Sequence, residues 1–428
     1  MKLIKTILAV IIIGFAISCL KEPKLMPKDG TTSNGGFGVP PINFGWENSK
    51  TVKLKVGITA FKTNTEKHVI AVYTQNPKLG GKLITSGTAS ASNNFETQFS
   101  LANIYDKVFV QEIVPGIGIY NQEVALNNTM IMVKFNNANA SLGKTENIIP
   151  PQIDSDNDLV PDSVDQYPND STKAYNNYYP FENSKATLAF EDLWPSLGDY
   201  DMNDVVVSYK YNIVTNANNK VVQVLANYTL LATGGSFKNG FGVEFPISRS
   251  QVNELSGAGL ESGQSKAVII LFNNMRNEME TYNTVSTQGI SDSINYHVSF
   301  NVINGPLLAD FGLSAYNPFI WNNTNGFGRG YEVHLPNNLP TNLANVNLFG
   351  THLDNSSLTF GRYYVSKTNE MPWALNIPAP FNYPKEKSKI NEAYLKFNDW
   401  VQSCGVQSND WYLNKSGYRN NDKIFIKP

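Results

Sequence analysis

The chain has 428 residues, with 34 basic and 36 acidic side chains, so its formal net charge is −2. A near-neutral charge argues against nucleic-acid binding, which relies on a surplus of Lys and Arg. Charged residues make up only 16% of the chain, below the roughly 25% of an average soluble protein. The length is enough for two or three domains.

The N-terminal segment has the pattern of a secretory signal. Two lysines precede an apolar run from Ile7 to Ile17, which is too short to span a bilayer as a mature helix. The run ends in Ala-Ile-Ser-Cys, and this ending resembles bacterial lipoprotein signals in which the cysteine, here Cys19, becomes the lipidated first residue. We expect a signal peptide over residues 1–18 and a flexible, lipid-anchored tether over residues 19–41. The alternative is an ordinary signal peptide with a chance cysteine.

Residues 42–138 have the pattern of a small β domain. Short runs in which apolar and polar residues alternate are separated by clusters of Gly, Asn, Pro and Ser. The clearest runs are residues 51–60, 68–73, 107–113 and 129–135. Short strands at this spacing predict a β-sandwich of immunoglobulin-like or transthyretin-like type, which would act as a spacer or binding module.

Residues 139–179 form a predicted connector that carries a twelve-residue acidic loop, residues 154–165. Carboxylates occupy loop positions 1, 3, 5, 9 and 12, and a backbone carbonyl is available at position 7. The predicted ligands are Asp154, Asp156, Asp158, the carbonyl of Val160, Asp162 and Asp165. This is the ligand spacing of a calcium loop, because Ca²⁺ takes six to eight oxygens. The alternative is a solvated acidic linker.

Residues 154–170, DSDNDLVPDSVDQYPND, resemble a thrombospondin type 3 calcium repeat. The resemblance implies a Ca²⁺ cofactor. The family has glycine at loop position 6, where this chain has Leu159. Since glycine permits the sharp turn between ligands, we expect Leu159 to adopt an unfavourable backbone geometry or the loop to open slightly.

A second acidic segment opens the second predicted domain, residues 180–428. Its oxygen-bearing side chains are Glu191, Asp192, Asp199, Asp201, Asn203 and Asp204, and a run rich in β-branched residues follows. An all-oxygen set suits calcium better than zinc. The alternative is that these side chains cap turns by accepting hydrogen bonds from backbone N–H groups. The sequence is consistent with both metal binding and backbone capping.

The second domain as a whole resembles the LruC-type domain of bacterial surface lipoproteins. The resemblance rests on FEDLWPSLGDYDMNDVVVSY together with residues 317–320, 331–336, 340–341, 371–375, 383–384 and 411–412. It covers most of residues 186–426. It implies a β-rich domain that is secreted or anchored at the surface, and it implies no particular activity.

The rest of this domain predicts further strands and one helix. Strands are expected over residues 221–232, 267–272, 296–303 and 358–365. A single amphipathic helix is expected over residues 386–403, with an apolar face of Ile390, Ala393, Tyr394, Phe397, Trp400 and Val401. That face is expected to pack against a sheet. An exposed aromatic binding face is the alternative.

The sequence predicts a mainly β, non-catalytic protein. No serine-hydrolase elbow, zinc-protease motif or phosphate loop occurs, and the four histidines show no metal or triad spacing. We therefore expect a lipid-anchored, calcium-binding protein of the bacterial outer-membrane surface that acts in adhesion or binding. Its expected partners are the membrane, through Cys19, and a surface glycan or an extracellular protein.

The alternative function is a glycan-binding or polysaccharide-processing surface lipoprotein. A glycoside hydrolase needs only two suitably spaced carboxylates, which a sequence does not reveal. A glycan-binding module could use the flat rings of Trp321, Trp373 and Trp411. Burial of the same rings in a β core would explain them equally well.

Overall fold

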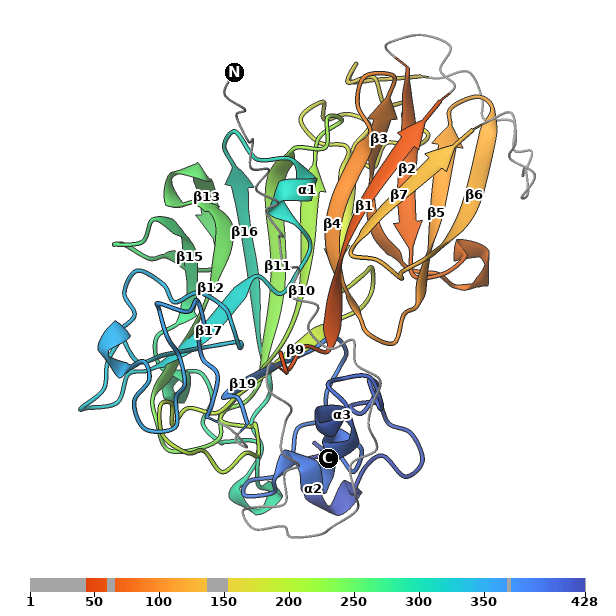
Figure 1. Cartoon of the computed structure of the whole chain (residues 1–428). Helices are drawn as coiled ribbons and strands as arrows, with labels where there is room; N and C mark the ends of the chain where they lie inside the picture. The colour runs from red at the N-terminus through yellow and green to blue at the C-terminus, as the bar shows by residue number, and fades with distance from the viewer. Residues whose placement is uncertain (1–43, 60–65, 137–152, 368–370, 428) are drawn as a thin grey trace, which may run out of the picture.

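The computed structural model describes residues 44–59, 66–136, 153–367 and 371–427. The predicted signal peptide, Cys19 and the tether lie outside the described residues. Within the described residues no helix is both long and apolar enough to cross a membrane. The fold is mainly β, as predicted, and two β units stand side by side above a small C-terminal region with short helices (Figure 1).

The N-terminal sandwich, residues 44–136, consists of two sheets. One has the strand order β4-β1-β7 and the other β3-β2-β5-β6. The strands are β1 (Ser49–Ile58), β2 (Lys67–Tyr73), β3 (Leu83–Ser90), β4 (Phe95–Ala102), β5 (Lys107–Val114), β6 (Gly118–Ala125) and β7 (Met130–Phe135). Along β1, Val52, Leu54 and Val56 are buried and alternate with more exposed residues, which is the period of a strand with one face in the core. The predicted β-sandwich is confirmed.

The C-terminal unit contains a seven-stranded and a five-stranded sheet. The larger has the order β13-β16-β11-β10-β9-β19, with β8 also paired to β10, and the smaller has the order β14-β15-β12-β17-β18. The larger sheet comprises β8 (Tyr175–Tyr179), β9 (Ala186–Phe190), β10 (Val205–Thr215), β11 (Val221–Ala232), β13 (Val252–Ser256), β16 (Ile294–Val302) and β19 (Ala374–Ile377). The smaller comprises β12 (Asn239–Ser248), β14 (Gly259–Leu260), β15 (Lys266–Phe272), β17 (Asn317–Asn322) and β18 (Glu332–His334).

Aromatic side chains from the two sheets form the core between them. The Tyr211 ring of β10 lies 5.8 Å from that of Phe245 in β12, and the Tyr228 ring of β11 lies 6.0 Å from that of Phe241. All four side chains are buried. Such edge-to-face aromatic pairs add to the free energy gained by burial.

Three of the four predicted strands after residue 220 are confirmed by β11, β15 and β16. The strand predicted over residues 358–365 is wrong. This segment forms turns around an isolated bridge between Ser357 and Arg362, with Gly361 at φ +60° and Phe360 largely exposed. A left-handed glycine in the middle of the run ends the extended conformation there.

The single helix predicted over residues 386–403 is also wrong. Two short helices, α2 (Ile390–Ala393) and α3 (Phe397–Gln402), occupy the segment. Tyr394 between them has an extended backbone, at φ −116° and ψ 96°, and forms a bridge with Arg419. The apolar face nevertheless packs in a core with Leu375 and Ile377 of β19 in the larger sheet, as predicted. The exposed aromatic binding face is therefore excluded.

Backbone and side-chain hydrogen bonds join the two β units. Asn177 of β8 accepts a hydrogen bond from Thr85 Oγ1 of β3 at 2.6 Å. Asn219 accepts one from the Thr88 backbone N–H at 2.8 Å and donates one to the Thr88 carbonyl at 2.8 Å. The short helix α1 (Leu308–Phe311) contacts β4, beside a parallel bridge between Phe99 and Leu313. These contacts fix the two units against one another.

Candidate metal centres

The acidic loop, residues 154–165, lies where the two β units meet. Val160 is 1% exposed and packs in a small apolar cluster with Val69 of the N-terminal sandwich and with Tyr175 and Ala217 of the C-terminal unit. Lys67 Nζ at the start of β2 donates a hydrogen bond to the Asp158 carbonyl oxygen at 3.0 Å. The loop therefore contacts both units.

Short-range hydrogen bonds from aspartates to the backbone shape the loop. Asp154 accepts from the backbone N–H groups of Asn157, at 2.8 Å, and Leu159, at 3.0 Å. Asp158 Oδ1 accepts from the Val160 N–H at 2.7 Å. Leu159 has φ +73°, a left-handed conformation that glycine adopts without strain and leucine does not. The unfavourable geometry expected for Leu159 is confirmed.

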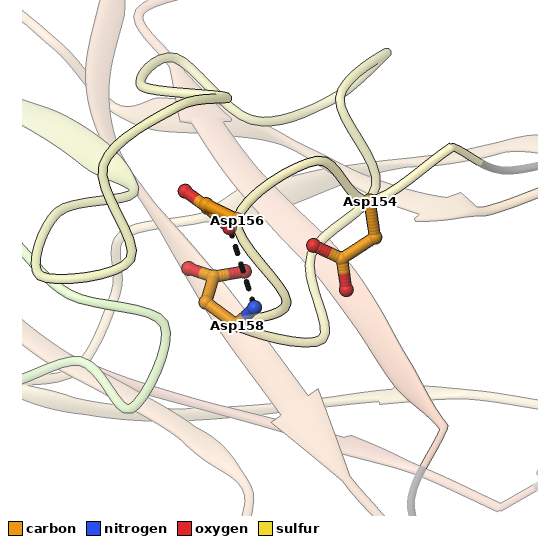
Figure 2. A group of neighbouring side chains, drawn as sticks. All are labelled: Asp154, Asp156 and Asp158. Atoms are coloured by element: carbon orange, nitrogen blue, oxygen red, sulfur yellow. Dashed lines mark hydrogen bonds between the residues drawn. The ribbon is translucent and has the colours of Figure 1, made fainter.

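Three carboxylates converge in this loop, as Figure 2 shows. One oxygen each from Asp154, Asp156 and Asp158 lies within 4.8 Å of the others. The Oδ2 atoms of Asp156, Asp158 and Asp165 are buried and have no hydrogen-bond partner, and Asp165 as a whole is only 7% exposed. A buried carboxylate oxygen without a partner is costly, so three of them in one loop fit the donor set of a hard cation.

The electrostatics of the loop also favour a positive ion. The pKa of Asp165 is raised to about 6, first by burial and then by the negative charges of Asp158, Asp156 and Asp154. Burial likewise raises the pKa of Asp158. These carboxylates destabilise one another when they are ionised together, and a bound cation would remove that repulsion.

One further predicted ligand, Asp162, has hydrogen-bond partners within the loop. Asp162 accepts hydrogen bonds from Ser155 Oγ, at 2.6 Å, and from the Ser155 N–H, at 2.8 Å, and the pKa of Asp162 is lowered by these bonds. Asp162 is therefore directed at Ser155 and is outside the converging group. Val160 contributes a buried side chain at the joint.

The acidic turn, residues 191–204, connects β9 to β10 inside the C-terminal unit. One oxygen each from Glu191, Asp199 and Asp201 lies within 4.8 Å of the others. Glu191 and Asp201 are each 1% exposed, and Asp199 is exposed. The sequence-predicted residues are thus brought together here too.

Backbone N–H groups donate hydrogen bonds to several carboxylate oxygens of the acidic turn. Glu191 accepts from the N–H groups of Met202, at 2.7 Å, and Tyr200, at 3.1 Å. Asp201 Oδ2 accepts from the Lys387 N–H at 2.7 Å. The capping use therefore occurs in the structure. Because each carboxylate oxygen has two lone pairs, capping leaves room for an ion.

The remaining members of the acidic turn form a second hydrogen-bonded group. Asp204 accepts from the Asp192 N–H at 3.0 Å, and Asp192 accepts from Asn239 Nδ2 at 2.6 Å. Asn203 donates to the Pro384 carbonyl at 3.2 Å, and its own Oδ1 is buried without a partner. Asn239 was not anticipated, because it lies 35 residues beyond Asp204 and no local pattern connects the two.

Burial raises the pKa of every buried carboxyl in the acidic turn. The pKa of Asp201 is raised to about 8, first by burial and then by Asp199, and the pKa of Asp192 is raised to about 6. The pKa values of Glu191 and Asp204 are also raised well above their usual range. Ionising these carboxyls within the fold is therefore costly.

Residues 219–412 match the model of a family described as a domain of unknown function, DUF4842. A crystal structure described as "a Putative lipoprotein from Bacteroides ovatus" is 16% identical, with a TM-score of 0.55, over 85% of this chain and 100% of that chain. At this identity the likeness shows a shared fold. A comparison with curated proteins finds no match.

The three tryptophans considered for sugar stacking are not available at the surface. Trp321 is 2% exposed, Trp373 1% and Trp411 0%. Trp373 and Trp411 also donate from their indole nitrogens, to the Ser196 carbonyl and to Asn48 Oδ1 respectively. The stacking role that the alternative function gave these rings is excluded, and their burial in a β core is confirmed.

Proposed function

We propose that this chain is a lipid-anchored, calcium-binding protein of the bacterial outer-membrane surface, with an adhesion or binding role and no catalytic one. The observation that carries the proposal is the acidic loop, with its three converging carboxylates and its buried, unpartnered oxygens. The cysteine at the end of the signal pattern supports the anchor, as does the description of the Bacteroides ovatus protein of similar fold.

The residues that would hold the ion are Asp154, Asp156, Asp158 and Asp165. Calcium would supply the positive charge that their buried oxygens lack. Because Val160 contacts both β units and the Asp158 carbonyl contacts the N-terminal sandwich, an ordered loop would also stiffen the joint between the units. We further propose that residues 154–170 form a thrombospondin type 3-like repeat and that the C-terminal unit is an LruC-type domain.

The acidic turn is the second candidate for an ion. Its support is the convergence of Glu191, Asp199 and Asp201, and its backbone caps are present with or without an ion. We propose that these caps stabilise the fold and that the acidic loop is the main calcium site.

Calorimetric titration of the full-length protein with CaCl₂ tests the calcium site. The protein is expected to bind calcium, and Asp156→Asn with Asp158→Asn is expected to weaken binding at the loop by at least tenfold. The matched control, Asp292→Asn with Asp422→Asn, removes the same charge from exposed positions and is expected to leave binding unchanged. Equal weakening by both pairs would show that net charge alone causes the effect, and it would contradict the proposed calcium site.

Membrane fractionation tests the anchor. Cys19→Ser is expected to release the protein from the membrane fraction or to leave an unprocessed precursor. Normal processing and membrane retention of this variant would overturn the lipoprotein assignment.

A further inference from the structure

A polar groove runs between the two β units, beside the acidic loop. Its main cavity measures about 420 Å³ and is lined by Lys55, Lys67 and the β3–β4 hairpin on one side, and by Asn218, Asn219 and α1 on the other. A neighbouring cavity of about 320 Å³ shares Lys55, Glu96 and Ala309 with it. Figure 1 shows α1 next to β4 at this junction. We call this feature the interdomain groove.

The walls of the interdomain groove are held together. Thr88 and Asn219 exchange two hydrogen bonds of 2.8 Å, and Thr88 Oγ1 donates to the Ala217 carbonyl at 2.7 Å. Leu313 and the β4 backbone exchange hydrogen bonds of 2.7 and 2.8 Å. A groove with fixed walls loses little conformational entropy when a ligand binds.

The lining combines amides and hydroxyls with charges that are already compensated. Lys55 Nζ lies 2.6 Å from Glu96, and the negative charges of Asp158 and Asp154 act on Lys67. Ser90, Ser92, Asn93 and Asn94 add hydroxyl and amide groups, and the side chains of Asn94 and Asn218 are exposed. Compensated lysines do not suit a polyanion, and a lining this polar does not suit an apolar ligand.

A small apolar surface completes the groove. Leu307, which is 47% exposed, and Ala309 face the cavity from the α1 side. A sugar ring presents hydroxyls at its edge and C–H groups on its faces, so it needs amide and hydroxyl partners together with some apolar contact. The cavity volume lies within the usual range for small-ligand sites.

We propose that the interdomain groove binds a neutral oligosaccharide. The proposal rests on the binding role proposed above and gives that role a ligand class. Lys67 lines the groove and also bonds to the acidic loop, so calcium in the loop strengthens sugar binding by fixing one wall. The groove keeps its shape without calcium, because the Thr88–Asn219 and Leu313 hydrogen bonds do not involve the acidic loop.

The test is calorimetry of the full-length protein with neutral hexasaccharides of glucose, xylose and mannose. The protein is kept in a polyoxyethylene detergent, which has no sugar headgroup. At least one hexasaccharide is expected to bind. Asn94→Ala with Asn218→Ala is expected to weaken that binding by roughly tenfold, the effect of losing two neutral hydrogen bonds. The control Asn127→Ala with Asn253→Ala, at exposed positions outside the groove, is expected to have no effect.

Two outcomes overturn the groove proposal. One is the absence of binding by all three hexasaccharides, and the other is binding that Asn94→Ala with Asn218→Ala leaves unchanged. Tighter binding of dextran sulfate than of the neutral sugars would overturn the assigned ligand class. Each titration is repeated in EDTA and in calcium. Sugar binding without any calcium effect would contradict only the Lys67 link, whereas calcium binding without sugar binding would contradict only the groove.

Discussion

Leu159 stands at the sharpest turn of the acidic loop, with φ +73° and 54% of its surface exposed. A leucine in the left-handed region costs about 1–2 kcal/mol relative to its preferred conformations. An exposed side chain makes few contacts that could offset this cost. The position thus limits how easily the loop orders around an ion.

Leu159→Gly is expected to raise the calcium affinity of the loop. Removing a strain of about 1 kcal/mol corresponds to roughly a fivefold gain in affinity. The measurement is calorimetric titration with CaCl₂. As a control, Leu339→Gly replaces another exposed leucine, one outside both acidic segments and outside the residues with positive φ, and is expected to give no gain. An unchanged or weaker affinity of the Leu159 variant would contradict the account of strain.

Residue spacing predicted which aspartates enter the loop but not where each carboxylate is directed. Asp154, Asp156 and Asp158 converge as expected, while Asp162 is directed at Ser155. Sequence spacing carries no information about such a local competition for hydrogen bonds. Lys67 was missed for a different reason, because it is far from the loop in sequence and meets it only in the fold.

Among the elements, the acidic turn contains four buried carboxyls whose pKa values are raised. Burial raises the pKa of Asp201 from 3.8 to about 8. Between these values the folded state binds more protons than the unfolded state, so stability falls as the pH rises through this window. Asp192, whose pKa is raised to about 6, likewise makes stability fall as the pH rises.

In EDTA the melting temperature is therefore expected to fall between about pH 4 and pH 8. Asp201→Asn, which removes the charge, is expected to flatten this fall, although it also weakens one backbone cap and lowers the melting temperature at every pH. The check is a series of melting curves over this pH range. A melting temperature that rises from pH 5 to pH 8 in EDTA would contradict the predicted direction of the pH dependence. Calcium that flattens the curve would indicate an ion in the turn as well.

Local periodicity predicted strands well and the C-terminal helix poorly. Alternating apolar residues identified β1, β11 and β16 because each of these strands is long and buries one face. A continuous apolar run identified β15. The stripe from Ile390 to Val401 identified a buried face. It did not show that Tyr394 leaves the helical conformation to pair with Arg419. A tertiary contact of this kind overrides a helical pattern.

At the scale of the whole molecule, the two β units pack as neighbours that share polar contacts. The bond between Thr85 and Asn177 spans 92 residues, and the bonds between Thr88 and Asn219 span 131. Single-sequence patterns do not reveal pairings at such separations. The mainly β class and the position of the acidic loop were therefore predictable, whereas the interdomain groove, which exists only through these contacts, was not.

The acidic loop is expected to link calcium to the stability of the whole molecule, because Val160 packs against both units and the Asp158 carbonyl bonds to the N-terminal sandwich. A ligand that binds only the folded state stabilises it by mass action. The most direct measurement is differential scanning calorimetry of the full-length protein in millimolar calcium and in EDTA, with Asp156→Asn and Asp158→Asn as the comparison. The account predicts a melting temperature several degrees higher in calcium, and a much smaller difference in the variant. Identical melting curves in calcium and in EDTA, with no bound ion by elemental analysis, would contradict the calcium site.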